Sequence, residues 1–144
     1  MVKINYKSLV IGILLGFLFW LIGFVVVGSA RYDFIANKPV PFNFGMYGAM
    51  LILTFIITLI ILVVYLWKYE QNNPIIPDKW AVDALIFGTI LCGMNVLFDI
   101  IFFGIFLGIN LITYFFFQST TGYIYPLIIL ETVILAYLIY GKNE

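Results

Sequence analysis

The sequence predicts an all-α polytopic membrane protein, a bundle of four transmembrane helices that forms one domain over residues 1–144. Of its residues, 65% are hydrophobic and only 10% are charged, whereas a soluble domain is about half apolar and about a quarter charged. The mean hydropathy is +1.15. Four segments also have the roughly 20 apolar residues that cross a bilayer. A water-soluble monomer is therefore excluded.

Three of the four spans are read directly from uninterrupted apolar runs. Residues 9–28 and 45–66 contain no charged side chain, and residues 123–140 contain one, Glu131. Each run is close to the length that about 30 Å of hydrocarbon requires. The remaining residues fill short tails and connections, so we expect no soluble domain.

The third apolar segment is too long for one span. It begins at Ala84 and stays apolar to Phe117, which as a single helix would measure about 50 Å. We expect it to break between Gly104 and Gly108, which gives a span over 84–106. Residues 109–118, rich in aromatic side chains, would then lie along the membrane interface. A single long, tilted helix is the alternative.

The basic residues are divided unequally between the two sides of the predicted bundle. Arg31 and Lys38 fall on one side, and the other five fall on the opposite side: Lys3, Lys7, Lys68, Lys79 and Lys142. Lys and Arg concentrate on the cytoplasmic side of membrane proteins. The sequence therefore predicts a multi-pass protein of the cell membrane with both termini in the cytoplasm.

The first 30 residues allow a second interpretation. Lys3 and Lys7, an apolar run and the small residues Gly28-Ser29-Ala30 together imitate a cleavable signal peptide. The apolar run of about 20 residues is longer than the 7–15 of a typical signal peptide. We therefore expect a retained first span. Cleavage would leave three spans.

The composition excludes several classes of function. The chain has no His and one Cys, Cys92, which removes disulfides, thiolate or imidazole metal sites and every nucleophile–His mechanism. Seven basic residues balance seven acidic ones, so nothing points to nucleic acid. Asp78 and Asp83 are expected to complement the positive start of the third helix, with Asp78 as its cap. We expect no cofactor and no enzymatic activity.

Small residues recur at helical spacing and predict close helix packing. Gly12 and Gly16 stand in GxxxG spacing on one face of the first span, which also carries Trp20. Gly104 and Gly108 repeat the spacing near the end of the third. Helices in lipid associate through such small residues and through interhelical hydrogen bonds. Packing within one bundle and dimerisation are both open.

Two acidic residues lie inside predicted spans and need an explanation, because a carboxylate at bilayer depth costs at least about 2.5–3.5 kcal/mol. Asp99 and Glu131 should therefore face a polar interior. Asn95, four residues before Asp99, could donate to it, and Arg31 could reach inward from the end of the first span. One interpretation is structural: an Arg31–Asp99 pair and a protonated Glu131. The other is a site for a proton, a metal cation or a cationic amphiphile.

The second half resembles an uncharacterised family of small four-helix integral membrane proteins of bacteria and archaea. The resemblance rests on the Asn95-x-x-x-Asp99 pair, the aromatic residues Tyr114 to Phe117, and the sequence Gly122-Tyr123-x-x-Pro126. The Gly–Trp opening between Gly16 and Trp20 fits the same family. The resemblance implies the four-helix fold and no activity.

The function that these observations favour is non-enzymatic. We expect a small binding or transport module that uses the buried acids Asp99 and Glu131, with the lipid bilayer as its surroundings and a homodimer as one arrangement. The alternative is an accessory or assembly subunit that docks on a larger membrane protein complex through its helix faces.

Overall fold

The computed structural model describes residues 6–33, 35–68, 73–118 and 121–141, and most of them are helical. The long α-helices are α1 (Tyr6–Gly28), α2 (Phe44–Lys68), α3 (Trp80–Asp99) and α4 (Ile124–Tyr140). Each belongs to an apolar stretch long enough to cross a membrane, and the candidate spans are Leu9–Gly28, Phe44–Leu66, Pro77–Phe106 and Thr121–Tyr140.

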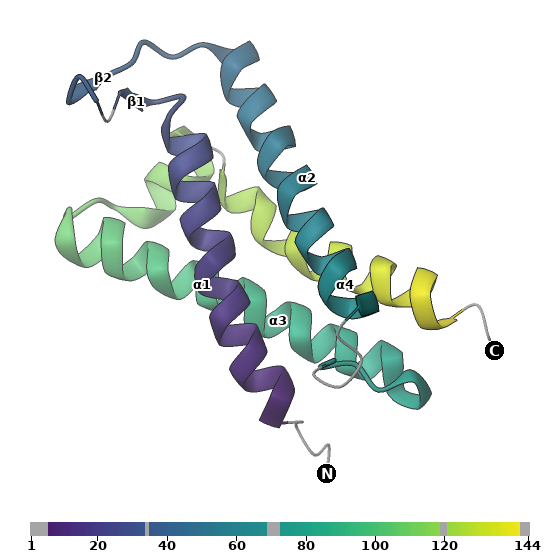
Figure 1. Cartoon of the computed structure of the whole chain (residues 1–144). Helices are drawn as coiled ribbons and strands as arrows, with labels where there is room; N and C mark the ends of the chain where they lie inside the picture. Colours follow the sequence, from purple (N-terminus) through teal and green to yellow (C-terminus); the bar gives the residue numbers. More distant parts are fainter. Residues whose placement is uncertain (1–5, 34, 69–72, 119–120, 142–144) are drawn as a thin grey trace.

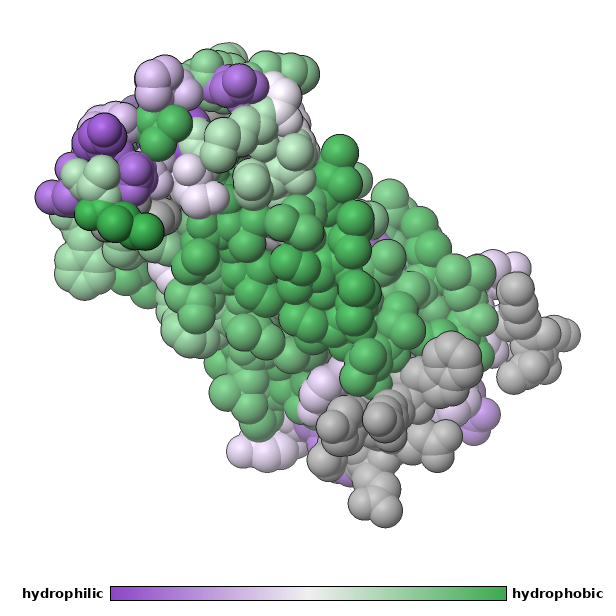
Figure 2. Space-filling model, turned by 45° about the horizontal axis from the view of Figure 1, so that its top comes forward, coloured by the Kyte–Doolittle hydropathy of each residue, from purple (hydrophilic) through white to green (hydrophobic). Residues whose placement is uncertain are grey.

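The helices alternate in direction. In Figure 1, α1 and α3 run toward the upper left and α2 and α4 run back toward the lower right. The central element is α3, which packs against both α1 and α4, and α2 packs against α1 and α4. Figure 2 shows a broad hydrophobic band on one face, with hydrophilic residues gathered at the upper left end.

The core lies where α1, α2 and α4 meet α3. Phe87 and Leu91 of α3 and Leu62 and Leu66 of α2 have no exposed surface. They recur at intervals of four residues, which places them on one face of each helix. The rest of the buried cluster is also apolar: Ile11, Leu15, Phe19, Ile75, Ala84, Ile128, Leu135 and Ala136.

Glycines allow the close approach of α1 to α3. A Cβ atom on Gly12 would stand 2.5 Å from Ile90 Cγ2, and one on Gly16 would stand 2.5 Å from Met94 Cβ. Gly88 plays the same part between α3 and α4, because a Cβ there would lie 3.1 Å from the Cα of Ile129. The first GxxxG pair therefore packs within the chain.

The second GxxxG pair lies at a turn. After Asp99 the helix widens into a π-helix, η3 (Ile100–Phe106), and the chain then reverses at Gly108, whose φ is 64°. This left-handed conformation suits a residue without a Cβ. Gly104 faces Leu111 across the turn. Gly104 and Gly108 thus lie at a reversal of the chain, where Gly104 faces the returning helical segment.

The chain returns toward α4 through two short helical segments. The first, η4 (Thr113–Gln118), is π-helical, and the second, η5 (Thr121–Tyr123), is a 3-10 turn. Phe115 is buried, whereas Phe117 is exposed. The aromatic residues 114–117, which the sequence analysis places at the membrane interface, therefore include one buried side chain, Phe115.

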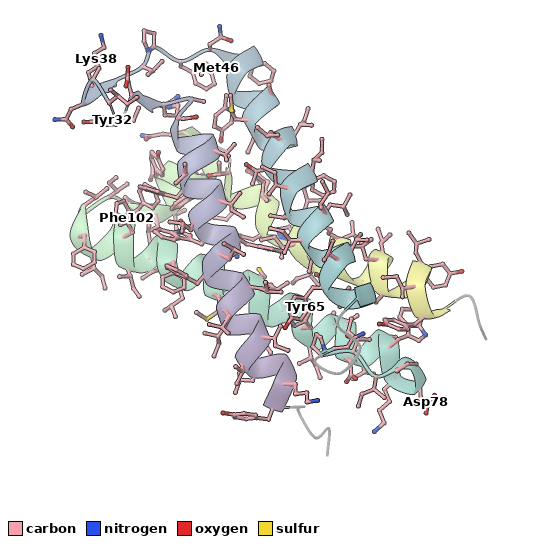
Figure 3. All side chains as sticks on the ribbon, in the orientation of Figure 1. Tyr32, Lys38, Met46, Tyr65, Asp78 and Phe102 are labelled. Carbon is pink, nitrogen blue, oxygen red and sulfur yellow. The ribbon has the colours of Figure 1, made fainter. Side chains whose placement is uncertain are left out.

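A short hairpin, which the sequence analysis does not predict, joins α1 to α2. Strand β1 (Tyr32–Asp33) pairs antiparallel with β2 (Lys38–Pro39). The Asp33 carboxylate accepts the backbone N–H groups of Ile35 and Ala36, a local turn that Asp favours. Figure 3 shows Tyr32 and Lys38 at this end of the molecule.

The entry to α3 differs from the prediction. Asp78 makes no side-chain capping bond in η2 (Pro77–Lys79), so its expected role as a cap is wrong. Asp83, one turn into α3, instead bonds back to the preceding loop: its Oδ2 accepts the backbone N–H of Ile76 at 2.9 Å. Proline at position 77 fixes the first residue of the turn and leaves the N–H of Ile76 facing the later aspartate.

The basic residues that the structure describes lie at two ends. Lys7 begins α1 and Lys79 precedes α3, whereas Arg31 and Lys38 lie in the connection between α1 and α2. Figure 3 shows Lys38 and Asp78 at opposite ends of the molecule. Lys3, Lys142 and the Lys68 side chain fall outside the described residues.

Replacing Gly16 by Ala should separate α1 from α3. The new Cβ would lie 2.5 Å from Met94 Cβ and 3.0 Å from its Cγ, so the helix must move, and overpacking costs about 1–3 kcal/mol. We expect a lower thermal midpoint in detergent micelles. Gly23→Ala on the same helix is the matched control, because its Cβ meets only Thr54 Cγ2 at 4.0 Å. Equal midpoints for the two variants would contradict this packing.

Candidate functional site

Asp99 joins three helices. It is the last residue of α3, and its Oδ1 accepts a hydrogen bond of 2.9 Å from the indole Nε1 of Trp20 on α1. Its Oδ2 accepts a hydrogen bond from the hydroxyl of Tyr125 on α4. Buried carboxyl groups need such donors because hydrocarbon surroundings provide none. The two bonds fix α1 and α4 against the end of α3.

Aromatic rings surround this junction. Trp20 stacks on Phe24 at 5.3 Å between ring centroids and meets Phe102 edge-on at 5.8 Å. Phe102, labelled in Figure 3, comes from η3, just beyond Asp99. We call the connected rings the aromatic cluster, which consists of Phe17, Trp20, Phe24, Phe98, Phe102, Phe103, Tyr114, Phe115 and Tyr125.

A cavity of about 190 Å³ lies beside Asp99. Its walls are almost wholly apolar, and among the described lining residues only Asp99 and Tyr125 have polar side chains. The lining residues are Val96, Asp99, Ile100, Leu111, Ile112, Phe115, Phe116 and Tyr125. They come from the end of α3, the start of η3, the returning segment and α4. A cavity of 150 Å³ in another protein holds benzene, so this one has room for a slightly larger molecule.

Asn95 does not donate to Asp99. Its Nδ2 donates to the carbonyl of Leu91 at 2.8 Å and approaches that of Gly16 at 3.4 Å. Helical side chains lean toward the N-terminus, so the nearest acceptor is one turn before Asn95, and Asp99 is one turn after it. The buried Asn95 instead faces α1 where Gly16 allows close approach.

Arg31 also lies away from Asp99. Its guanidinium carbon stands 4.8 Å from the ring centroid of Phe42, a favourable cation–π geometry, and its carbonyl accepts the N–H of Val40. The hairpin between α1 and α2 holds this backbone in place. Within the described part of the chain, Asp99 has hydrogen-bond donors but no basic partner, so the expected Arg31–Asp99 pair is wrong.

Glu131 is a separate buried acid. It lies on α4 with 7% of its surface exposed, and its Oε1 has no hydrogen-bond partner among the described residues. It comes six residues after Tyr125, about 9 Å along the helix axis, and it does not line the cavity at Asp99. The expectation that one cavity holds both acids is therefore wrong.

The acids do not gather into a metal-binding set. Among the described residues, no group of three or more His, Cys, Asp or Glu side chains could hold one ion. Cys92 is a half-buried free thiol of α3.

The sequence analysis missed the role of two residues at this site. Trp20 stands four and eight residues after Gly16 and Gly12, so the spacing that places these glycines against α3 also brings Trp20 there. Tyr125 lies three residues before Ile128, which is buried. Helical spacing thus carried a signal for both residues, but it could not show that they meet at Asp99.

No family model, curated protein or solved structure matches this chain. The resemblance of its second half to small four-helix membrane proteins stays a prediction. So does a homodimer or a partner in a larger membrane complex.

Asp99→Leu should destabilise the protein, because it leaves the Trp20 indole N–H and the Tyr125 hydroxyl without their acceptor. A buried donor without a partner costs about 1–3 kcal/mol. Asp99→Asn keeps a side-chain oxygen and is the matched control, with a smaller fall in thermal midpoint. Trp20 emission, measured with Trp67 and Trp80 replaced by Phe, should change more in the Leu variant. A Leu variant as stable as the parent would contradict the hydrogen bonds.

Glu131→Met should stabilise the protein. The substitution removes a buried oxygen that has no partner and keeps a flexible side chain of similar length. We expect stabilisation by about 1–3 kcal/mol, seen as a higher thermal midpoint. Glu131→Gln, which keeps a buried polar group, should change the midpoint little. A lower midpoint for the Met variant would show that the carboxyl group is satisfied in the native protein.

Proposed function

We propose that the chain is an integral membrane protein whose four apolar helices form a bundle. Its candidate spans are 20 to 30 residues long, and side chains such as Leu14, Ile52 and Leu130 are exposed along them. Figure 2 shows a broad hydrophobic band on one face of the helices, a surface suited to lipid contact. In hydrocarbon a helix satisfies its own backbone hydrogen bonds, which supports a spanning role for all four.

The orientation that we propose places both termini in the cytoplasm of the cell membrane. Lys7 and Lys79 lie at one end and Arg31 and Lys38 at the other. Including Lys3, Lys68 and Lys142, the sequence assigns five basic residues to the first end, and the positive-inside rule makes that end cytoplasmic. The cavity at Asp99 then lies toward the outer half of the bilayer.

The activity that we propose is the binding of a small molecule in the cavity at Asp99, as a binding or transport module. The observation that carries this proposal is an apolar cavity of about 190 Å³ with a hydrogen-bonded carboxyl group in its wall. Ligand sites are typically apolar clefts with a few placed polar groups. In this cavity Asp99 and Tyr125 are the placed polar groups.

Bromobenzene, a small neutral quencher of Trp fluorescence, tests the cavity. In vesicles containing a variant whose only Trp is Trp20, we expect a saturable quenching component, because Trp20 contacts Asp99 at the cavity wall. Val96→Phe should remove that component by filling the cavity. Val82→Phe is the matched control, since Val82 is an exposed residue of the same helix outside the lining.

Partitioning of the probe into lipid is measured separately. A variant whose only Trp is Trp80, at the other end of α3, should show quenching that rises with probe concentration and does not saturate. If Val96→Phe left the quenching of Trp20 unchanged, the cavity would not bind the probe and the proposed function would fail.

A further inference from the structure

Among the described residues, the cavity at Asp99 is lined by one acidic side chain and no basic one. Of the eight lining residues, Asp99 alone is ionisable near neutral pH. Arg31 is the basic residue that the sequence analysis offered as a partner for Asp99. Its guanidinium group lies against Phe42 instead. A carboxylate in apolar surroundings is stabilised by a positive partner. The cavity therefore presents an acid that a cationic ligand would complement.

The carboxyl group retains room to accept further hydrogen bonds. An ionised carboxylate has about four acceptor positions on its two oxygens. The Trp20 indole uses one position on Oδ1, and the Tyr125 hydroxyl uses one on Oδ2. The remaining positions can accept N–H groups of a cation, and hydrogen bonds between charged groups are the strong ones.

Aromatic rings line the same space as Asp99. Phe115, Phe116 and Tyr125 line the cavity with Asp99. Ring faces attract organic cations, and ammonium groups are recognised in aromatic cages. The lining suits a bare metal ion less well. Calcium takes about six to eight oxygen ligands, whereas the described lining residues include two oxygen-bearing side chains.

The volume of the cavity limits the size of the apolar part that a ligand can have. About 190 Å³ exceeds the 150 Å³ of a cavity that holds benzene, which leaves space for a six-membered ring with a short arm. Leu111, Ile112 and Ile100 would contact the ring, and the arm would bring its terminal group to Asp99.

We infer that the ligand is a protonated amine that carries a compact apolar group, with the ammonium bound to Asp99 and the apolar part among the lining rings and aliphatic side chains. This inference rests on the proposed function and names its ligand class. The same ammonium chemistry could come from a free amine or from the headgroup of an aminolipid.

Displacement of bromobenzene tests the ligand class. In phosphatidylcholine vesicles, whose net charge is zero, benzylammonium, benzyl alcohol and benzoate compete for the saturable quenching of Trp20. We expect benzylammonium to displace the probe at a concentration about tenfold or more below that of benzyl alcohol. Benzoate should be weakest. Asp99→Asn should remove the preference for the cation.

Glu131→Gln is the matched control, because Glu131 lies outside the cavity and its loss should leave the preference intact. If Asp99→Asn does not fold, the three probes on the parent protein still decide the question. Equal potency of the three probes, or a preference for benzoate, would overturn the ligand class and leave the cavity function standing. Loss of all saturable quenching would overturn the proposed function itself.

Vesicles that also contain phosphatidylethanolamine separate the two sources of the amine. If benzylammonium becomes weaker as this lipid is added, the headgroup competes for the cavity and the ligand is an aminolipid. If its potency is unchanged, the ligand is a free amine. Either result supports the ammonium class.

Discussion

A carboxyl group within an apolar protein interior must find hydrogen-bond donors, and at Asp99 this requirement joins three helices. Trp20 provides one donor from α1 and Tyr125 provides another from α4. Each donor is a large ring with a single polar atom, so it satisfies Asp99 without bringing further polar surface inside. The two bonds therefore set the depth of α1 and α4 relative to the end of α3.

The hydrogen bond to Trp20 depends on how closely α1 approaches α3. Gly12 and Gly16 face Ile90 and Met94 with no Cβ between them, and Trp20 follows one helical turn later on the same face. A larger side chain at either glycine would move the indole away from Asp99. The small residues and the polar junction thus form one arrangement, in which the glycines allow the approach and the carboxyl group fixes it.

Much of the fold could be predicted from the sequence, and the site could not. Uncharged runs show the long helices, and spacing shows the glycine face. The partners of Asp99 depend on the rotation and depth of three helices, which composition does not contain. Helical spacing suggested Asn95 as a partner of Asp99, the end of the first span suggested Arg31, and both suggestions are wrong. Asn95 uses a carbonyl of its own helix and Arg31 uses a ring in its own connection.

The cavity exists because α3 does not continue as a regular helix. At Ile100 it widens into a π-helix, a distortion that is frequent at functional sites, and at Gly108 the chain turns back. The returning segment places Leu111, Ile112 and Phe115 opposite Asp99. A straight helix would have carried these side chains away from α4 and left the carboxyl group on an open surface. The break in the longest apolar segment thus brings apolar side chains next to the acid that the other two helices hold.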